Sequence, residues 1–322
     1  MKNQSTIRKA PRNKTISLLS DEFVTYSKRL VRLTQSAQLN AVLNKTINQD
    51  IFEILSYLPS DFVDLLVIDP PYNLRKSYNG SVFKSKSNDE YAKWFECWFI
   101  PLLRILKKTA SVYICSDWKT SSIIQPILEE HLVIQNRITW EREKGRGAKN
   151  NWKNCSEDVW FCTTSNNYTF NVDAVKMRRK VIAPYKDALG KPKDWEESEQ
   201  GNYRTTYPSN LWTDITIPFW SMPENTEHPT QKPEKLLAKI ILAGSNPDDI
   251  VFDPFLGSGT TSVVAKKLDR NYIGVEIDPT YCCLAEKRLE RVESCKRIQG
   301  YSDEVFWERN SVPTTPASKG GK

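Results

Sequence analysis

Two short stretches of this chain carry the residue types that chemistry needs. The first is Asp69-Pro70-Pro71-Tyr72, which follows the apolar run 63–68. The second is Gly-Ser-Gly-Thr-Thr at 257–261, which comes shortly after the apolar run 249–252. Open α/β sheets bind ligands just beyond the carboxyl ends of their parallel strands. If both runs are buried parallel strands, each stretch stands where such a sheet places its ligands.

The first stretch offers hydrogen-bond acceptors for an amine. A residue before proline favours extended backbone, and proline has no N–H, so the loop is stiff and presents a carboxylate and bare carbonyls. An exocyclic amine on an aromatic ring is a poor nucleophile because its lone pair is delocalised. Acceptors at Asp69 and Pro70 would bind its two hydrogens and draw it towards tetrahedral geometry, with Tyr72 stacked on the ring. The alternative is a structural turn with a core tyrosine.

The second stretch is typical of a cofactor-binding turn. Its glycines let the backbone approach a ligand closely, and the helix predicted at 260–268 offers free N–H donors at its start. It lacks the lysine of a P-loop, and position 262 is serine where a dehydrogenase has a third glycine. Glu276 ends the next apolar run. Its distance along the chain from the glycines is about that at which nucleotide-binding folds carry an acid for the ribose hydroxyls. The pattern predicts an adenosine-like cofactor, with a plain turn as the alternative.

The surrounding elements predict an α/β fold. Short β-branched runs indicate buried strands, and longer amphipathic stretches indicate helices. A strand, a glycine loop, a helix and a strand that ends in an acid form a βαβ unit. The strands are expected at 63–68, 111–115, 249–252 and 271–276, and the helices at 88–106, 235–243, 260–268 and 280–297.

Composition excludes several classes of protein. The two histidines, His131 and His228, and seven cysteines without a CxxC pair leave little material for a zinc site or a Ser-His-Asp triad, so no metal is expected. No apolar run is long enough to cross a bilayer, and the first residues contain no apolar signal core. We therefore expect a cytoplasmic protein that has no membrane partner.

Charge and pattern divide the chain further. Residues 1–35 hold eight basic residues against two acidic ones, which predicts a partly disordered arm that either screens DNA phosphates or is simply solvated. Residues 142–227 lack clean periodicity and are rich in Lys, Arg, Asn, Trp and Tyr, as in an inserted subdomain. Residues 301–322 are predicted to be the C-terminal tail, and its part 311–322, rich in Ser, Thr, Pro and Gly, is predicted to be loose.

Taken together, the motifs resemble the β-class, S-adenosylmethionine-dependent DNA amino-methyltransferases, most of which modify adenine N6. The target motif at 69–74 precedes the cofactor motif at 253–261, an order that defines the class. The resemblance covers roughly 40–145 and 225–295, and 142–227 matches nothing residue by residue, as expected for a target-recognition region. Further matching segments are 48–50, 137–140, 228–233 and 276–278.

The resemblance implies a Rossmann-like methyltransferase fold that is circularly permuted and carries an inserted target-recognition region. Residues 36–141 would be the catalytic half, 142–227 the insertion and 228–300 the cofactor-binding half. The implied reaction transfers a methyl group from S-adenosylmethionine to adenine N6 in double-stranded DNA after base flipping, without a metal. A homodimer and a cognate restriction endonuclease are the further partners expected.

The same resemblance assigns the site residues. Catalysis would rest on Asp69, Pro70, Pro71 and Tyr72. The residues implied for cofactor binding are Asp50, Asp69, Lys232, Asp253, Pro254, Phe255, Gly257, Ser258, Gly259, Thr260, Thr261 and Glu276.

Other assignments come from the residues themselves and keep an alternative. A basic and aromatic stretch around Trp152 suits DNA phosphates, and the alternative is an ordinary exposed face. Lys232 meets either the cofactor carboxylate or solvent, and His228 is expected to cap the following helix rather than to act directly. The aromatic residues at 94–99 are expected in the core. The basic residues of the DNA-binding stretch are Lys144, Arg146, Lys149 and Lys153.

Rival functions share parts of this pattern. Cytosine N4 is also an exocyclic amine, but enzymes that modify it more often carry serine where this chain has Asp69. An inactive DNA-binding module of the same fold is disfavoured because Asp69, Tyr72 and the loop glycines are intact. A dehydrogenase lacks the Asp-Pro-Pro-Tyr loop, and the motif order favours DNA over RNA or protein as the substrate.

Overall fold

The centre of the molecule is an eight-stranded sheet. The computed structural model describes residues 10–78, 81–142, 149–181, 185–198, 201–309 and 311. All neighbouring strands of the sheet are parallel except β7, which runs antiparallel to β5 and β6. In spatial order the strands are β1 (Lys45–Asn48), β13 (Asn271–Glu276), β12 (Ile250–Asp253), β2 (Val63–Ile68), β5 (Leu106–Ser116), β7 (Ser156–Thr163), β6 (Val133–Glu141) and β11 (Leu211–Trp212).

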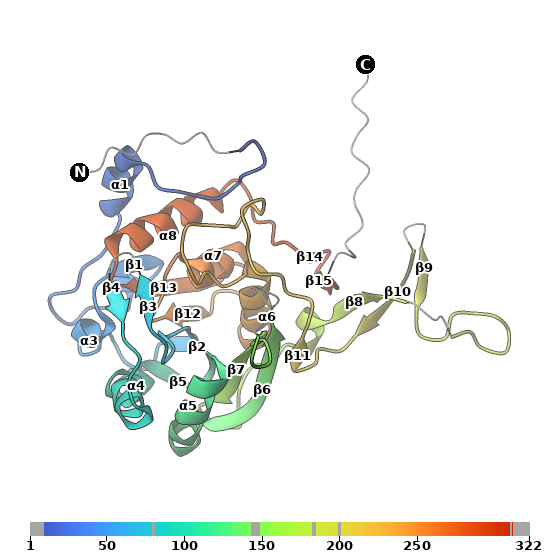
Figure 1. The fold of residues 1–322 in the computed structure, drawn as a ribbon, viewed down its shortest axis with the longest axis horizontal. Coiled ribbons are helices and arrows are strands. Elements are labelled where there is room, and N and C mark those ends of the chain that lie inside the picture. The colour runs from blue at the N-terminus through green and yellow to red at the C-terminus, as the bar shows by residue number, and fades with distance from the viewer. Residues whose placement is uncertain are drawn as a thin grey trace.

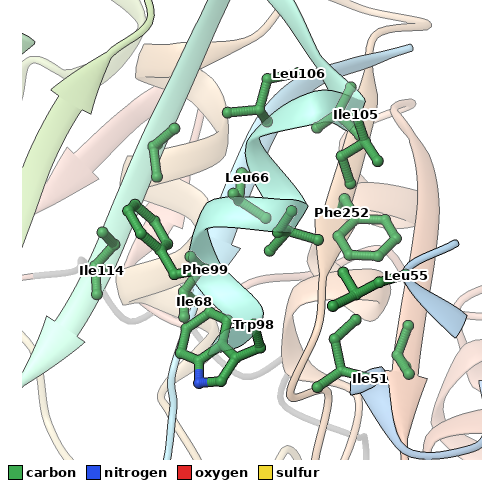
Figure 2. Close-up of a cluster of buried hydrophobic side chains, with 14 of the residues drawn as sticks. Ile51, Leu55, Leu66, Ile68, Trp98, Phe99, Ile105, Leu106, Ile114 and Phe252 are labelled. Atoms are coloured by element: carbon green, nitrogen blue, oxygen red, sulfur yellow. The ribbon is translucent and has the colours of Figure 1, made fainter. Parts of the chain in front are cut away.

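Helices cover both faces of this sheet, which gives three layers (Figure 1). Successive residues of β2 face opposite sides, so Leu66 packs into one apolar core and Leu65 into the other. The first core contains side chains of α3, α4 and α5, and the second contains side chains of α6, α7 and α8. Figure 2 shows Trp98 and Phe99 of α4 within the first core. The helices are α1 (Ser20–Ser27), α2 (Leu39–Val42), α3 (Ile51–Ile54), α4 (Asn88–Leu102), α5 (Trp118–His131), α6 (Glu234–Gly244), α7 (Thr260–Lys267) and α8 (Pro279–Arg291).

Local sequence explains where the helices begin. Ser87 accepts a hydrogen bond from the Glu90 amide at the start of α4, and the Glu90 carboxylate accepts one from the Ser87 amide. Asp117 caps α5, and Asp278 caps α8 just before a proline in its first turn. These caps place helix starts close behind strand ends. Such turns keep the loops at the carboxyl edge short.

The predicted strands and helices are confirmed, with shifts at their ends. The strand predicted at 111–115 is longer and starts at residue 106, so the helix predicted at 88–106 ends earlier, followed by a 3-10 turn at Leu103–Ile105. The helix predicted at 280–297 ends at residue 291. The strand β7 was missed, because its run Val-Trp-Phe-Cys lies in a region that showed no periodicity.

The range 142–227 contributes to two different sheets. Its strand β7 lies inside the central sheet, between β5 and β6. Three later strands, β8 (Met177–Lys180), β9 (Glu196–Ser198) and β10 (Gly201–Thr206), project from the body as an arm (Figure 1). The arm is completed by β14 (Tyr301–Ser302) and β15 (Val305–Trp307), because β15 pairs in parallel with β8. A 3-10 turn, Val172–Val175, precedes the arm, and a small hairpin of β3 (Lys76–Tyr78) and β4 (Ser81–Phe83) lies between β2 and α4.

The N-terminal segment is held against the body where the structure describes it. Helix α1 packs on α8, and Lys287 of α8 donates to the Glu22 carboxylate at 2.5 Å. Ile16 forms an isolated parallel bridge with Thr226. Residues 1–9 of the predicted arm and 312–322 of the predicted tail lie outside the described residues. Among the described helices, none has the length and apolarity to cross a membrane.

Candidate active site

A cavity of about 610 Å³ opens along the carboxyl edge of the central sheet. The loops that follow β1, β2, β5, β12 and β13 all contribute to its wall. Parallel strands end at the same edge, so the Asp-Pro-Pro-Tyr loop and the glycine loop meet although the chain separates them widely. The volume falls within the roughly 300–1,000 Å³ typical of small-molecule sites.

Most residues predicted for the site line this cavity. Gly259 does not line it, although its neighbours do. Lys149 and Lys153 are exposed and lie outside the cavity wall, and Lys144 and Arg146 fall in 143–148, outside the described residues. No group of three or more His, Cys, Asp or Glu side chains in the described ranges is arranged to hold a metal ion. The predicted residues on the wall are Asp50, Asp69, Pro70, Pro71, Tyr72, Lys232, Asp253, Pro254, Phe255, Gly257, Ser258, Thr260, Thr261 and Glu276.

The Asp-Pro-Pro-Tyr loop presents two open acceptors. Oδ1 of Asp69 accepts from Lys232 Nζ at 2.7 Å and from the Tyr72 hydroxyl at 3.1 Å. Among the described residues, none donates to Oδ2. The Pro71 carbonyl accepts from the Tyr91 hydroxyl at 2.8 Å, whereas the Pro70 carbonyl accepts from no described residue. A carboxylate oxygen and a carbonyl oxygen on the wall thus remain available for a ligand.

A buried glutamate that sequence reasoning missed completes this corner of the site. Glu157 Oε2 lies 3.1 Å from the Tyr72 hydroxyl, whose single proton it shares with Asp69 Oδ1, and 3.3 Å from Lys232 Nζ, while Oε1 lies 2.5 Å from Arg142 Nη1. Burial alone would raise the pKa of Glu157, but the cations Lys232 and Arg142 hold it below its usual value. Burial alone would lower the pKa of Lys232, but Asp69 and Glu157 raise it. The Glu157 carboxylate and the Lys232 ammonium are therefore both expected to be charged at neutral pH.

The reversed strand explains why Glu157 gave no signal in the sequence. Because β7 runs antiparallel to β5, its amino end lies at the edge where the parallel strands have their carboxyl ends. Glu157 is the second residue of β7 and so reaches the cavity from the start of a strand. Nothing in its local sequence, Ser-Glu-Asp-Val, distinguishes it from a surface acid. Arg142, just after β6, also lines the cavity and was also missed.

The glycine loop is held by the acid that was predicted to bind ribose. Glu276 Oε2 accepts from the Gly257 amide at 2.9 Å, and Oε1 accepts from the Asp278 amide at 2.8 Å. Burial raises the pKa of Glu276 to about 7, and these two amides oppose the rise. Gly257 and Gly259 both have positive φ, +54° and +85°, which favours glycine. Glu276 thus shapes the loop and still faces the cavity.

Two further groups line the loop side of the cavity. Asp253 accepts from the Thr261 hydroxyl at 2.5 Å, and burial raises the pKa of Asp253 to about 7. The His228 ring packs edge-on against Tyr281 with 4.5 Å between ring centroids. Burial and then Lys232 lower the pKa of His228 to about 4, so this imidazole is neutral at pH 7.

The prediction that His228 caps the following helix is wrong. Helix α6 starts six residues later, and its first amide, that of Glu234, donates to the Glu224 carboxylate at 2.7 Å. Of the aromatic residues predicted in the core, Trp94 lines the cavity, where it packs against Phe83 and Phe255. Trp94 also packs against the first core, so the expectation holds in part: one side of α4 faces the cavity as well as that core.

An α/β sheet with an acceptor loop and a glycine loop at one edge defines a Rossmann-like methyltransferase. Solved structures support this fold: the chain matches the cytosine-N4-specific PvuII DNA methyltransferase with a TM-score of 0.57 at 18% identity, over 81% of this chain and 92% of that one. It also matches TTHA0409, a putative DNA modification methylase of Thermus thermophilus solved in complex with S-adenosyl-L-methionine, with a TM-score of 0.52 at 18% identity, over 82% and 98% of the two chains.

Sequence comparison then identifies the family. A family model described as DNA methylase matches residues 63–287, and the chain belongs to this family. DNA adenine methyltransferase YhdJ of Escherichia coli (strain K12) is 34% identical over 251 residues, which are 76% of this chain and 82% of the relative. Other relatives at 30–33% identity are named Type II methyltransferases. The predicted α/β methyltransferase fold and the assignment as a DNA methyltransferase are thus confirmed.

Proposed function

We propose that this chain transfers a methyl group from S-adenosylmethionine to adenine N6 at a specific site in double-stranded DNA. The pair of open acceptors, Asp69 Oδ2 and the Pro70 carbonyl, carries the proposal, because an exocyclic amine has two hydrogens to donate. These acceptors lie in the wall of the cavity, which a base stacked in a duplex does not reach. The target base must therefore leave the helix, as enzymes that modify bases require.

The chain's own residues supply position and fixed dipoles rather than a covalent step. The bound sulfonium provides an electrophilic methyl group. Asp69 and Pro70 hold the amine so that its lone pair turns out of the ring plane, and they stabilise the positive charge that develops on nitrogen. The hydroxyl of Tyr72 is tied to Asp69, which keeps its ring beside the acceptors. Fixing both reactants in this way is a major source of rate enhancement.

The wall of the cavity fits an adenosine-containing cofactor. Glu276 offers carboxylate oxygens for ribose hydroxyls, and the loop 257–261 offers close backbone approach at the start of α7. Asp50, after β1, lies on the same wall beside the apolar Phe52 and Ile277, which suit the faces of an adenine ring. The proposed set of cofactor-binding residues is completed by Asp253, Pro254, Phe255 and Lys232. Lys232 lies on Asp69, so its proposed contact with the cofactor carboxylate would be made from the acceptor side.

Cofactor affinity should depend on pH through Glu276. Its raised pKa of about 7 means that the acid is mostly protonated at pH 6 and mostly ionised at pH 8. Ribose hydroxyls donate better to the carboxylate, so we expect affinity to rise by up to about tenfold between these pH values. Calorimetry on the wild type and on Glu276→Gln tests this. The variant should lose about 1.5–3 kcal/mol at pH 8 and part of the pH dependence, the rest coming from Asp253 on the same wall; unchanged affinity at pH 8 would remove Glu276 from the ribose site.

The choice of adenine over cytosine rests on the Asp at position 69 and on the name of the relative from E. coli. A purine also presents more ring area to Tyr72 than a pyrimidine does. Mass spectrometry of nucleosides from DNA modified in vitro tests the proposal. N6-methyladenine is expected; N4-methylcytosine without N6-methyladenine would overturn the base assignment, and neither product would overturn the function.

We also propose that the insertion, 142–227, reads the target sequence. Lys149 and Lys153 are exposed and close in sequence to the cavity-lining Asn154, which supports a role in contacting phosphates, and Lys144 and Arg146 are proposed to act with them. The proposal also includes domain limits of 36–141 for the catalytic half and 228–300 for the cofactor-binding half, a circular permutation, a homodimer and a cognate restriction endonuclease. Light scattering at monomer mass would contradict the dimer.

An exchange of the arm should change sequence choice. The segment to replace by that of a relative is 176–207, because this exchange spares β7 and Glu157. We expect a folded chimera to keep methyl transfer and to modify a different site, as measured by sequencing of modified bases. An active chimera with the parental site would show that the arm does not read the sequence.

A further inference from the structure

The contact between Lys232 and Asp69 creates a conflict within the proposed mechanism. An ammonium that sits 2.7 Å from Asp69 Oδ1 competes with the target amine for this carboxylate. If Asp69 were its only anion, Lys232 would be free to follow the charge and to cover Oδ2 as well. The structure must therefore contain something that holds Lys232 to one side.

Glu157 is the group that does this. It is almost fully buried, with 5% of its side chain exposed, and it lies within 3.3 Å of Lys232 Nζ. The Tyr72 hydroxyl is 3.1 Å from a carboxylate oxygen of each acid and accepts from Lys232 at 3.1 Å. Asp69, Tyr72 and Glu157 thus surround the ammonium, and all of its contacts to Asp69 go to Oδ1.

The balance of charges in this corner also indicates that Glu157 is needed beside Lys232. Asp69 and Glu157 carry two negative charges, and Lys232 and Arg142 carry two positive ones. Arg142 is partly exposed at 35%, and its Nη1 lies 2.5 Å from Glu157 Oε1, on the side away from Lys232. Lys76 also lines the cavity and interacts with all four groups, so without Glu157 the positive charge of this corner would rise where the target nitrogen becomes positive. Buried networks of this kind are costly unless every member is paired.

We propose that Glu157 is a positioning residue of the methyl transfer: it holds Lys232 and Tyr72 on Oδ1 of Asp69, so that Oδ2 stays open to the target amine. The inference rests on the proposed function, because it assumes that Asp69 binds the amine. Glu157 itself touches neither the amine nor the methyl group in this scheme. Its effect passes through Lys232 and Tyr72.

The test is Glu157→Gln in the full-length chain, with duplex DNA and labelled S-adenosylmethionine. Gln keeps the shape and an acceptor for the Tyr72 hydroxyl but loses the charge. We expect kcat to fall about 10- to 100-fold, as for a misplaced reacting group, while KM for the cofactor changes by about threefold at most, because Lys232 keeps its charge for the cofactor carboxylate. The matched control is Asp158→Asn: the next residue of β7 is also buried, but it points to the opposite face, towards Thr139 and Arg137. The control should retain kcat within threefold.

The outcomes separate the possible explanations. Equal loss in Glu157→Gln and Asp158→Asn, or a change in cofactor KM matching that in kcat, would show a merely structural role and overturn the inference. If Glu157→Gln does not fold, Glu157→Asp keeps the charge but is shorter, and it should lower kcat by between about twofold and tenfold with unchanged cofactor affinity; unaltered kcat in either folded variant would also overturn it. A wild type that transfers no methyl group to DNA refutes the proposed function instead.

Discussion

Replacing Asp69 with alanine is expected to lower methyl transfer by at least about 100-fold while cofactor affinity stays within threefold. Asp69 supplies the charged one of the two acceptors, and removing one preorganised group that stabilises developing charge typically costs about 10²–10³ in kcat. The loss leaves Lys232 beside the amine with only Glu157 as its anion, which adds repulsion in the transition state. Transfer of label from the cofactor to duplex DNA measures the rate, and calorimetry measures cofactor binding.

A second substitution at this position serves as the control for shape. Asp69→Asn keeps the size of the side chain and one acceptor oxygen. If the hydrogen bond matters, its rate of methyl transfer should lie between those of the wild type and of the alanine variant. If the charge dominates, its rate should fall as far as that of the alanine variant. Near-normal turnover of Asp69→Ala would remove Asp69 from the reaction. Loss of cofactor binding in both variants would move its role to the cofactor.

The second large effect is expected at Gly259, which has φ +85° at the start of α7. A Cβ at this position would lie 2.5 Å from Ala285 Cβ and 2.9 Å from Ala285 Cα, and the latter belongs to the backbone of α8. Left-handed backbone costs an alanine about 1–2 kcal/mol, and overpacking costs about 1–3 kcal/mol more. Gly259→Ala should therefore lower the free energy of unfolding by about 2–5 kcal/mol and distort the loop that carries Gly257. Urea denaturation measures the first effect and cofactor calorimetry the second.

Gly190 provides a matched control, because it also has a positive φ but an added Cβ there would clash with nothing. Its φ is +77°, and an added Cβ would meet nothing within 4 Å. Gly190→Ala should thus lower the free energy of unfolding by only about 1–2 kcal/mol and leave cofactor binding intact. If both alanine variants lose the same stability, the contact with Ala285 carries no weight and the argument for Gly259 fails.

The local pattern of the sequence was sufficient to predict the strands and helices and half of the site. The run 63–68 is apolar and β-branched on both of its faces, so it had to be a strand buried between two layers. Two prolines after Asp69 and the glycines of 257–261 impose their turns locally, whatever surrounds them. Because parallel strands share one edge at their carboxyl ends, the same pattern also predicted that the two motifs lie together.

Tertiary structure alone decided the groups that complete the site. Glu157 reaches the cavity only because β7 runs against its neighbours, and strand direction is not encoded in the residues next to Glu157. Lys232 was predicted to meet a cofactor or solvent, but the structure places it on Asp69, whose position depends on the packing of β2. The open oxygen Oδ2 is likewise a property of the whole corner, since Lys232, Tyr72 and Glu157 come from three separate segments. Local sequence specifies backbone shape through short-range sterics, whereas the pairing of buried charges depends on which distant segments the packed sheet brings together.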